Sequence, residues 1–144
     1  MRCSLTVLVE VDPDYPYAPW IKGEEKRRRQ EEAAIDQAWA FFRRFISGKV
    51  DYPYPFIEAT RVADIGVDKA IEKIRDLEKL SEKLERYGRE AGQEVEWREV
   101  FEPCTSFFAD ATAPKPVYYL RKETEERIRR FPERFWLVTL WYHW

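Results

Sequence analysis

Residues 134–144, RFWLVTLWYHW, are the stretch on which the fold depends. The segment is rich in aromatic and strand-forming residues and contains neither glycine nor proline, which is typical of a β-strand. Side chains of a strand alternate between its two faces, and both faces of this segment are largely apolar. We therefore predict a central strand that is either covered on both faces, or covered on one and used for contact on the other.

The length and composition of the chain indicate one globular domain. With 144 residues, of which 44% are hydrophobic, the chain is long enough for one core, so we expect a single α+β domain over residues 1–144. Acidic and basic residues nearly cancel to a net charge of −2, which argues against a strongly basic nucleic-acid binder. No apolar run approaches the roughly 20 residues that cross a bilayer, and the N-terminus does not resemble a signal peptide. We expect a soluble, cytoplasmic protein without a membrane partner.

The contents of asparagine, glutamine and cysteine bear on the source of the protein and on the state of its thiols. The sequence contains no asparagine, three glutamines and one methionine, a balance that resembles thermophilic proteins. Codon bias in a GC-rich genome is the alternative explanation. Cys3 and Cys104 have neither a metal-binding nor a redox spacing, so we expect free thiols and no cofactor.

The hydrophobic periodicity predicts the element order β-α-β-α-β-β-α-β. The predicted strands are residues 2–11, 57–65, 94–102, 117–120 and 134–144, with a further short strand considered at 105–109, and the predicted helices are 24–46, 67–87 and 122–131. We expect a mostly antiparallel sheet of four to six strands with the two long helices packed on one face. The arrangement resembles a split β-α-β unit in architecture only.

Two patterns refine this expectation. Residues 2–11 alternate apolar and polar side chains except at Leu8, so the first strand should have one buried and one solvent-facing side. In the first long helix, Arg27, Arg28 and Glu31 share the azimuth of the apolar stripe, so the helix start should overhang the sheet.

Residue types that commonly serve in catalysis or metal binding are sparse in this sequence. The only histidine is His143, near the end of the chain, so a catalytic triad or a His/Cys metal site is not indicated. Asp12 and Asp14 follow the first strand, with Glu10 at its end, and the three acids are a weak candidate for the site of a metal-dependent nuclease. An ordinary turn explains the DPD sequence better, and we therefore predict no catalytic residue and no metal site.

One run of basic residues stands out at the start of the first long helix. The run is Lys26, Arg27, Arg28 and Arg29. Arginine forks suit phosphate groups, which makes the run a candidate nucleic-acid contact. Glutamates flank it on both sides, and this pattern favours a solvated, salt-bridged helix start instead.

Aromatic residues between prolines form a second group of candidates. The sequence DYPY occurs at residues 14–17 and again at 51–54, each time followed by proline, an aromatic residue and isoleucine. Such loops suit contact with a partner at low entropic cost, stacking on bases, or capping of the core. The candidate partner-binding residues are Tyr15, Tyr17, Trp20, Tyr52, Tyr54 and Trp141. We expect the two DYPY segments to share an aromatic rim, although matching strand and helix lengths favour opposite ends of the sheet.

These observations favour a non-enzymatic protein-binding module, acting as a small regulator or inhibitor of a larger assembly or by self-association. The abundance of aromatic residues and arginine, which are enriched at interface hot spots, is the reason. The alternatives are a nucleic-acid-binding accessory protein using the basic run and the Tyr-Pro loops, and the nuclease described above.

Overall fold

The computed structural model describes residues 2–45, 52–90, 106–115 and 117–143 of the chain, and the side chains of 4–45, 57–79, 106–115 and 117–141. The elements in chain order are β1 (Arg2–Glu10), α1 (Gly23–Phe45), β2 (Tyr52–Arg61), α2 (Val62–Ile65), α3 (Val67–Glu90), β3 (Ser106–Asp110), α5 (Lys122–Arg130), the 3₁₀ helix η2 (Pro132–Arg134) and β4 (Phe135–His143). The predicted strand at residues 94–102 and Cys104 lie outside the described residues.

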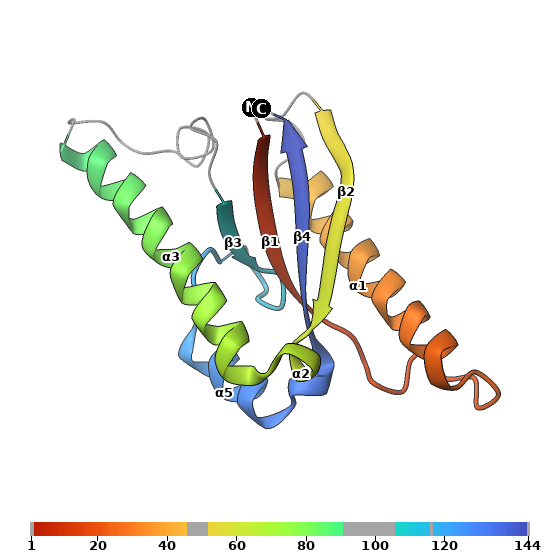
Figure 1. The fold of residues 1–144 in the computed structure, drawn as a ribbon. Coiled ribbons are helices and arrows are strands. Elements are labelled where there is room, and N and C mark those ends of the chain that lie inside the picture. Colours follow the sequence, from red (N-terminus) through yellow and green to blue (C-terminus); the bar gives the residue numbers. More distant parts are fainter. Residues whose placement is uncertain (1, 46–51, 91–105, 116, 144) are drawn as a thin grey trace.

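The last strand of the chain is central in the sheet, as predicted. The four described strands follow the order β2-β4-β1-β3, and β4 pairs antiparallel with both β2 and β1 (Figure 1). β3 pairs parallel with β1, so β1, β2 and β3 run in one direction and β4 runs against them. Two of the three described strand pairings are antiparallel, as expected, and the parallel pairing of β3 with β1 makes the sheet mixed.

The two long helices lie on opposite faces of the sheet, and the prediction that they share one face is wrong. α1 covers one face, and α3 and α5 cover the other (Figure 1). On the first face Ala34, Ala38 and Phe42 of α1 pack with apolar residues of all four strands, among them Leu5, Val7, Ile57, Phe107, Trp136 and Val138. On the second face, Ala70, Ile74 and Ile128 pack with residues that include Leu8, Phe108, Phe135 and Leu137.

Cover on both faces also changes the environment of β1. The side predicted to face solvent is buried, and its hydroxyl groups satisfy one another through hydrogen bonds across the sheet. Thr6 and Thr139 are 2.9 Å apart, and the Ser4 hydroxyl donates to Ser106 at 2.7 Å. The polar alternation of β1 therefore reflects hydroxyl pairing inside the protein rather than exposure to water.

Two predicted strands differ in the structure. β2 extends from Tyr52 to Arg61, so it begins before the predicted strand, and the following residues form the short helix α2. Residues 117–120 do not form a strand, and Val117 makes only an isolated bridge to Asp110. The predicted short strand at 105–109 is present as β3, and the predicted last helix is present as α5.

The strand register shows that the two DYPY segments do not share a rim. Tyr52 pairs with His143, and His143 pairs with Arg2 at the beginning of β1. Tyr15 instead follows Glu10, the last residue of β1. The length of β1, roughly 27 Å at about 3.3 Å per residue, separates the two ends. The two segments therefore lie at opposite ends of the sheet, as the matching strand and helix lengths favoured.

Within the described residues, no helix combines the length and the apolar character needed to cross a membrane.

Trp136 tests the central position of β4. It is 2% exposed and packs in the core under α1. Trp136→Ala should lower the free energy of unfolding by about 4 kcal/mol, because it removes a large buried ring and leaves a cavity. Trp20→Ala is the matched control, since Trp20 is exposed and its removal should change the value by less than about 0.5 kcal/mol. Equal denaturation midpoints for the two variants would contradict the central role of β4.

Candidate functional site

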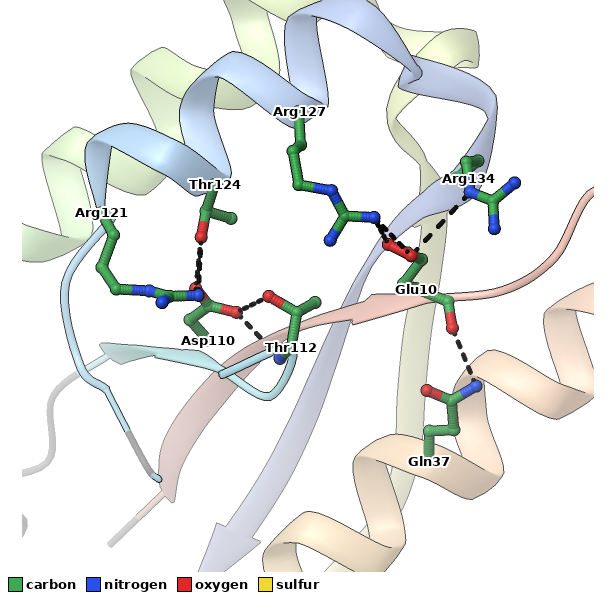
Figure 2. Close-up of polar contacts among 8 residues, drawn as sticks. All are labelled: Glu10, Gln37, Asp110, Thr112, Arg121, Thr124, Arg127 and Arg134. Carbon is green, nitrogen blue, oxygen red and sulfur yellow. Dashed lines mark hydrogen bonds and ion pairs between the residues drawn. The ribbon is translucent and has the colours of Figure 1, made fainter. Parts of the chain in front are cut away.

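The carboxyl ends of β1, β2 and β3 meet at one edge of the sheet, because these strands run in the same direction. The edge carries Glu10 at the end of β1, Arg61 at the end of β2 and Asp110 at the end of β3. Charged side chains of α5 and η2 reach the same edge (Figure 2). Ligands of sheets that contain parallel strands often bind at this edge, which makes its charged groups candidates for a site.

Glu10 is held by two arginines. Its carboxylate accepts hydrogen bonds from Arg127, with 2.9 Å to Oε2, and lies 3.8 Å from Nε of Arg134 (Figure 2). The backbone carbonyl of Glu10 accepts from the Gln37 side chain of α1 at 3.0 Å. The end of β1 is thus tied to the helices on both faces of the sheet.

Asp110 is fully buried, and its oxygens are occupied (Figure 2). One oxygen accepts hydrogen bonds from the backbone N–H and hydroxyl of Thr112, and the other accepts from the Thr124 hydroxyl at 2.9 Å. The same oxygen lies 3.5 Å from Arg121. The Thr124 hydroxyl, in the first turn of α5, therefore binds Asp110, and α5 has no side-chain cap hydrogen bond.

These contacts do not favour chemistry at the edge. The carboxylates of Glu10 and Asp110 are both engaged by donors, so neither is poised as a general base. Asp12, the second acid of the nuclease hypothesis, accepts hydrogen bonds within its own loop. Within the described residues no group of three acidic, histidine or cysteine side chains is arranged to hold a metal ion, so Glu10, Asp12 and Asp14 do not form the site that this hypothesis requires.

Residues 12–22, which lie between β1 and α1, form what we call the aromatic loop. Asp12 organises it by accepting hydrogen bonds from the backbone N–H of Asp14 at 2.9 Å and from the Tyr17 hydroxyl at 2.8 Å. The hydrogen bond from Asp14, followed by that from Tyr17, lowers the pKa of Asp12 below its ordinary value. The same bond to Asp12 raises the pKa of the Tyr17 hydroxyl.

Further contacts hold the aromatic loop against α1. The buried Gln30 side chain of α1 donates to the backbone carbonyls of Pro13 at 2.7 Å and Tyr15 at 3.1 Å. The rings of Tyr15 and Tyr17 pack edge to face with centroids 6.0 Å apart. Tyr17 has φ of 65°, a left-handed conformation that costs a non-glycine residue roughly 1–2 kcal/mol and is maintained here by these contacts.

The aromatic loop presents its largest side chains to solvent. Trp20 is 82% exposed and Tyr17 is 66% exposed, while Tyr15 is less so at 36%. The structure thus brings together three of the predicted partner-binding residues. Tyr52 and Tyr54 belong to β2 and start at the opposite end of the sheet, and Trp141 is half-buried on β4.

The basic run lies next to the aromatic loop, and most of its charge is paired. Arg28 forms an ion pair with Glu32 at 2.7 Å, and Arg29 lies 3.4 Å from Glu25. Arg27 instead forms an ion pair with Asp64 of α2. The salt-bridged helix start favoured from the sequence is confirmed for these three arginines.

Sequence reasoning missed two groups at this edge. Arg61 and Asp64 form an ion pair of 3.0 Å beside Arg27, and Gln30 anchors the aromatic loop. Arg61 and Asp64 fell within a predicted strand, where an interrupted apolar face was the only signal. Gln30 is a polar residue at a buried helical position, which is a pattern that indicates a specific hydrogen-bonding partner.

Comparisons with protein-family models, with curated proteins and with solved structures found no match to this chain. The candidate function therefore depends on the described contacts alone.

Asp110 tests whether the charged edge stabilises the fold. Asp110→Ala should lower the free energy of unfolding by about 3 kcal/mol, because it leaves buried donors of Thr112 and Thr124 without their acceptor. Thr124→Val should cost about 1 kcal/mol, as it removes one bond while the carboxylate keeps its other donors. Chemical denaturation of both variants and of the double variant measures this. A smaller loss for Asp110→Ala than for Thr124→Val would contradict the assignment.

The lowered pKa of Asp12 predicts how acid affects the aromatic loop. Because the folded pKa of Asp12 is depressed, its contribution is fully present above the unfolded pKa of about 3.8 and is lost as the pH falls through the lower folded value. The chain has six tryptophans, so the contribution of Trp20 is taken as the difference in fluorescence anisotropy between the parent and Trp20→Phe. This contribution should stay constant from neutral pH to about pH 4 and fall at lower pH. Asp12→Asn should show low anisotropy already at neutral pH. An identical pH profile for the variant and the parent would refute the role of Asp12.

Proposed function

We propose that this protein is a non-enzymatic protein-binding module whose contact surface is the aromatic loop. The observation that carries the proposal is the 82% exposure of Trp20 on a loop that is held in place by hydrogen bonds. Tryptophan and tyrosine are among the residues that contribute most to protein interfaces. An exposed tryptophan beside an exposed tyrosine would lose unfavourable hydration when a partner covers both.

The order of the loop supports the proposal further. Binding normally costs conformational entropy, and a loop already fixed in one conformation avoids part of this cost. Asp12 fixes Tyr17, and Gln30 fixes the backbone at Pro13 and Tyr15. These contacts preserve a conformation in which the large rings point outward instead of packing into the core, which is the arrangement expected of a contact surface.

Nucleic-acid binding is the second candidate, because the basic run and the aromatic loop are neighbours in the fold. Rings and cations together suit single-stranded nucleic acid. The ion pairs of Arg28 and Arg29, each with its own glutamate, reduce the charge that the basic run offers to phosphates. A polyanion would have to displace these carboxylates, so we rank a protein partner first.

More specifically, we propose that the protein regulates or inhibits a larger assembly through this loop. Self-association through the loop is the alternative. The protein immobilised as bait in a lysate of its native source should retain a partner protein identified by mass spectrometry. Trp20→Ala should weaken that interaction by about 2 kcal/mol, roughly 30-fold in Kd, as expected of an interface hot spot.

Tyr119→Ala is the matched control for this experiment. Tyr119 is also an exposed aromatic residue, at 60%, and its neighbour Leu120 contacts Glu78 of α3, on the other face of the sheet. The control should retain the partner at parental affinity. Retention by Trp20→Ala at parental affinity would refute the proposal, and loss of the retained material after nuclease treatment would favour the second candidate. Sedimentation of the parent and Trp20→Ala at several concentrations distinguishes self-association.

A further inference from the structure

A pocket of about 480 Å³ opens between the aromatic loop, the first turns of α1 and the end of β2. We call it the basic pocket. Its lining residues are Pro13, Gly23, Glu24, Lys26, Arg27, Gln30 and Arg61. It includes Lys26 and Arg27 of the basic run but neither Arg28 nor Arg29, so the structure divides the run into two pairs with different surroundings.

Positive charge exceeds negative charge around the basic pocket. Three lining residues are cations, and Glu24 is the one carboxylate among the lining residues. Arg27 and Arg61 share a single carboxylate, Asp64, so their two charges are neutralised only in part. Lys26 forms no ion pair within the described part of the chain, although the carboxylate of Asp12 is close enough to interact with its charge.

Arg61 has an additional donor to satisfy. Its side chain is 25% exposed, and its Nε atom is buried with no acceptor among the described residues. A buried donor without a partner is costly, and a shared carboxylate cannot satisfy two complete guanidinium forks. The two arginines therefore have hydrogen-bonding capacity beyond what Asp64 provides.

The backbone around the pocket adds to this electrostatic preference. Gly23 and Glu24, in the first turn of the 23-residue helix α1, line the pocket. Backbone N–H groups in the first turn of a helix have no partner inside the helix, and the helix dipole is positive at this end. The turn thus reinforces the effect of the three cationic side chains.

The walls of the pocket are held by the contacts that order the aromatic loop. Gln30 lines the pocket and uses its side-chain amide to hold the carbonyls of Pro13 and Tyr15. Arg61 belongs to the regular strand β2, and Arg27 and Lys26 belong to α1. Because their backbones belong to regular elements, only the side chains of these cations must be ordered when a ligand binds. The pocket also lies at the carboxyl ends of β1 and β2, where ligands of such sheets commonly bind.

We propose that the basic pocket is a phosphate-binding site, with Lys26, Arg27 and Arg61 as the groups that contact the anion. A doubly charged phosphate matches three convergent cations better than a single carboxylate does, and arginine forks donate to phosphate in a bidentate manner. Free phosphate and the phosphate group of a small phosphomonoester share this chemistry. The inference does not depend on a protein partner, because it concerns a small anion in a defined pocket.

Titration of the ¹⁵N-labelled full chain with sodium phosphate at constant ionic strength tests the site. The amide signals of Gly23, Glu24 and Lys26 should shift and saturate, and sodium chloride at matched ionic strength should not shift them. Lys26→Gln should weaken phosphate binding about tenfold, because it removes one charged donor. Arg61→Gln should weaken it at least as much. A parallel titration with phenyl phosphate distinguishes the sources, since tighter binding than inorganic phosphate would indicate a phosphomonoester.

Arg28→Gln is the matched control, because it removes the same charge from the same helix without altering the pocket lining. It should leave phosphate affinity unchanged. Equal weakening by Lys26→Gln and Arg28→Gln would show a nonspecific charge effect and overturn the proposal. Absence of saturable shifts would overturn it too. Shifts confined to a separate pocket, whose lining includes Arg44 and Lys115, would also overturn the proposal. Lys26→Gln keeps the test valid if Arg61→Gln fails to fold, since Lys26 is partly exposed and has no ion pair among the described residues.

Discussion

The pairing of β4 with both β1 and β2 is the constraint on which the rest of the structure depends. β4 is the last described element of the chain, yet it lies between two earlier strands and runs against both of them. The connection through α1 must therefore leave a gap of one strand between β1 and β2, which makes a split β-α-β unit. The sheet is incomplete without β4, because β4 joins β1 to β2.

The apolar character of both faces of β4 determines the number of layers. Trp136 and Val138 need cover on one face, and Phe135 and Leu137 need it on the other. Helices on a single face would leave one of these sets in water, and burial of each large side chain is worth on the order of 2–3 kcal/mol. The three-layer arrangement, with α1 opposite α3 and α5, follows from this requirement (Figure 1).

The parallel orientation of β1, β2 and β3 gathers the charged residues at one edge. Glu10 and Asp110 are satisfied by arginine and threonine side chains, and these contacts tie α5 and η2 to the sheet (Figure 2). Beyond this paired group lie the aromatic loop and the basic pocket, where large rings are exposed and positive charge is only partly neutralised. The same edge thus has a part whose charges are paired and support the fold, and a part whose rings and cations remain exposed or only partly paired.

The sequence by itself determined the elements with strong periodicity. The central final strand, the two long helices and the salt-bridged start of α1 follow from local patterns, because alternation, helical periodicity and charge spacing act between near neighbours in the chain. It also identified Tyr15, Tyr17 and Trp20 as aromatic residues in a proline-rich loop. Each of these features can be recognised within one short stretch of the sequence.

Only the tertiary structure decided how these pieces combine. The faces covered by the helices, the mixed sheet and the separation of Tyr15 from Tyr52 depend on which strand pairs with which, and that choice minimises exposed apolar surface over the whole chain. The same holds for the basic pocket, because Arg61 is 34 residues from Arg27 in sequence and meets it only through Asp64. Long-range pairing of this kind leaves no local periodic signal, so it becomes visible only when the fold is assembled.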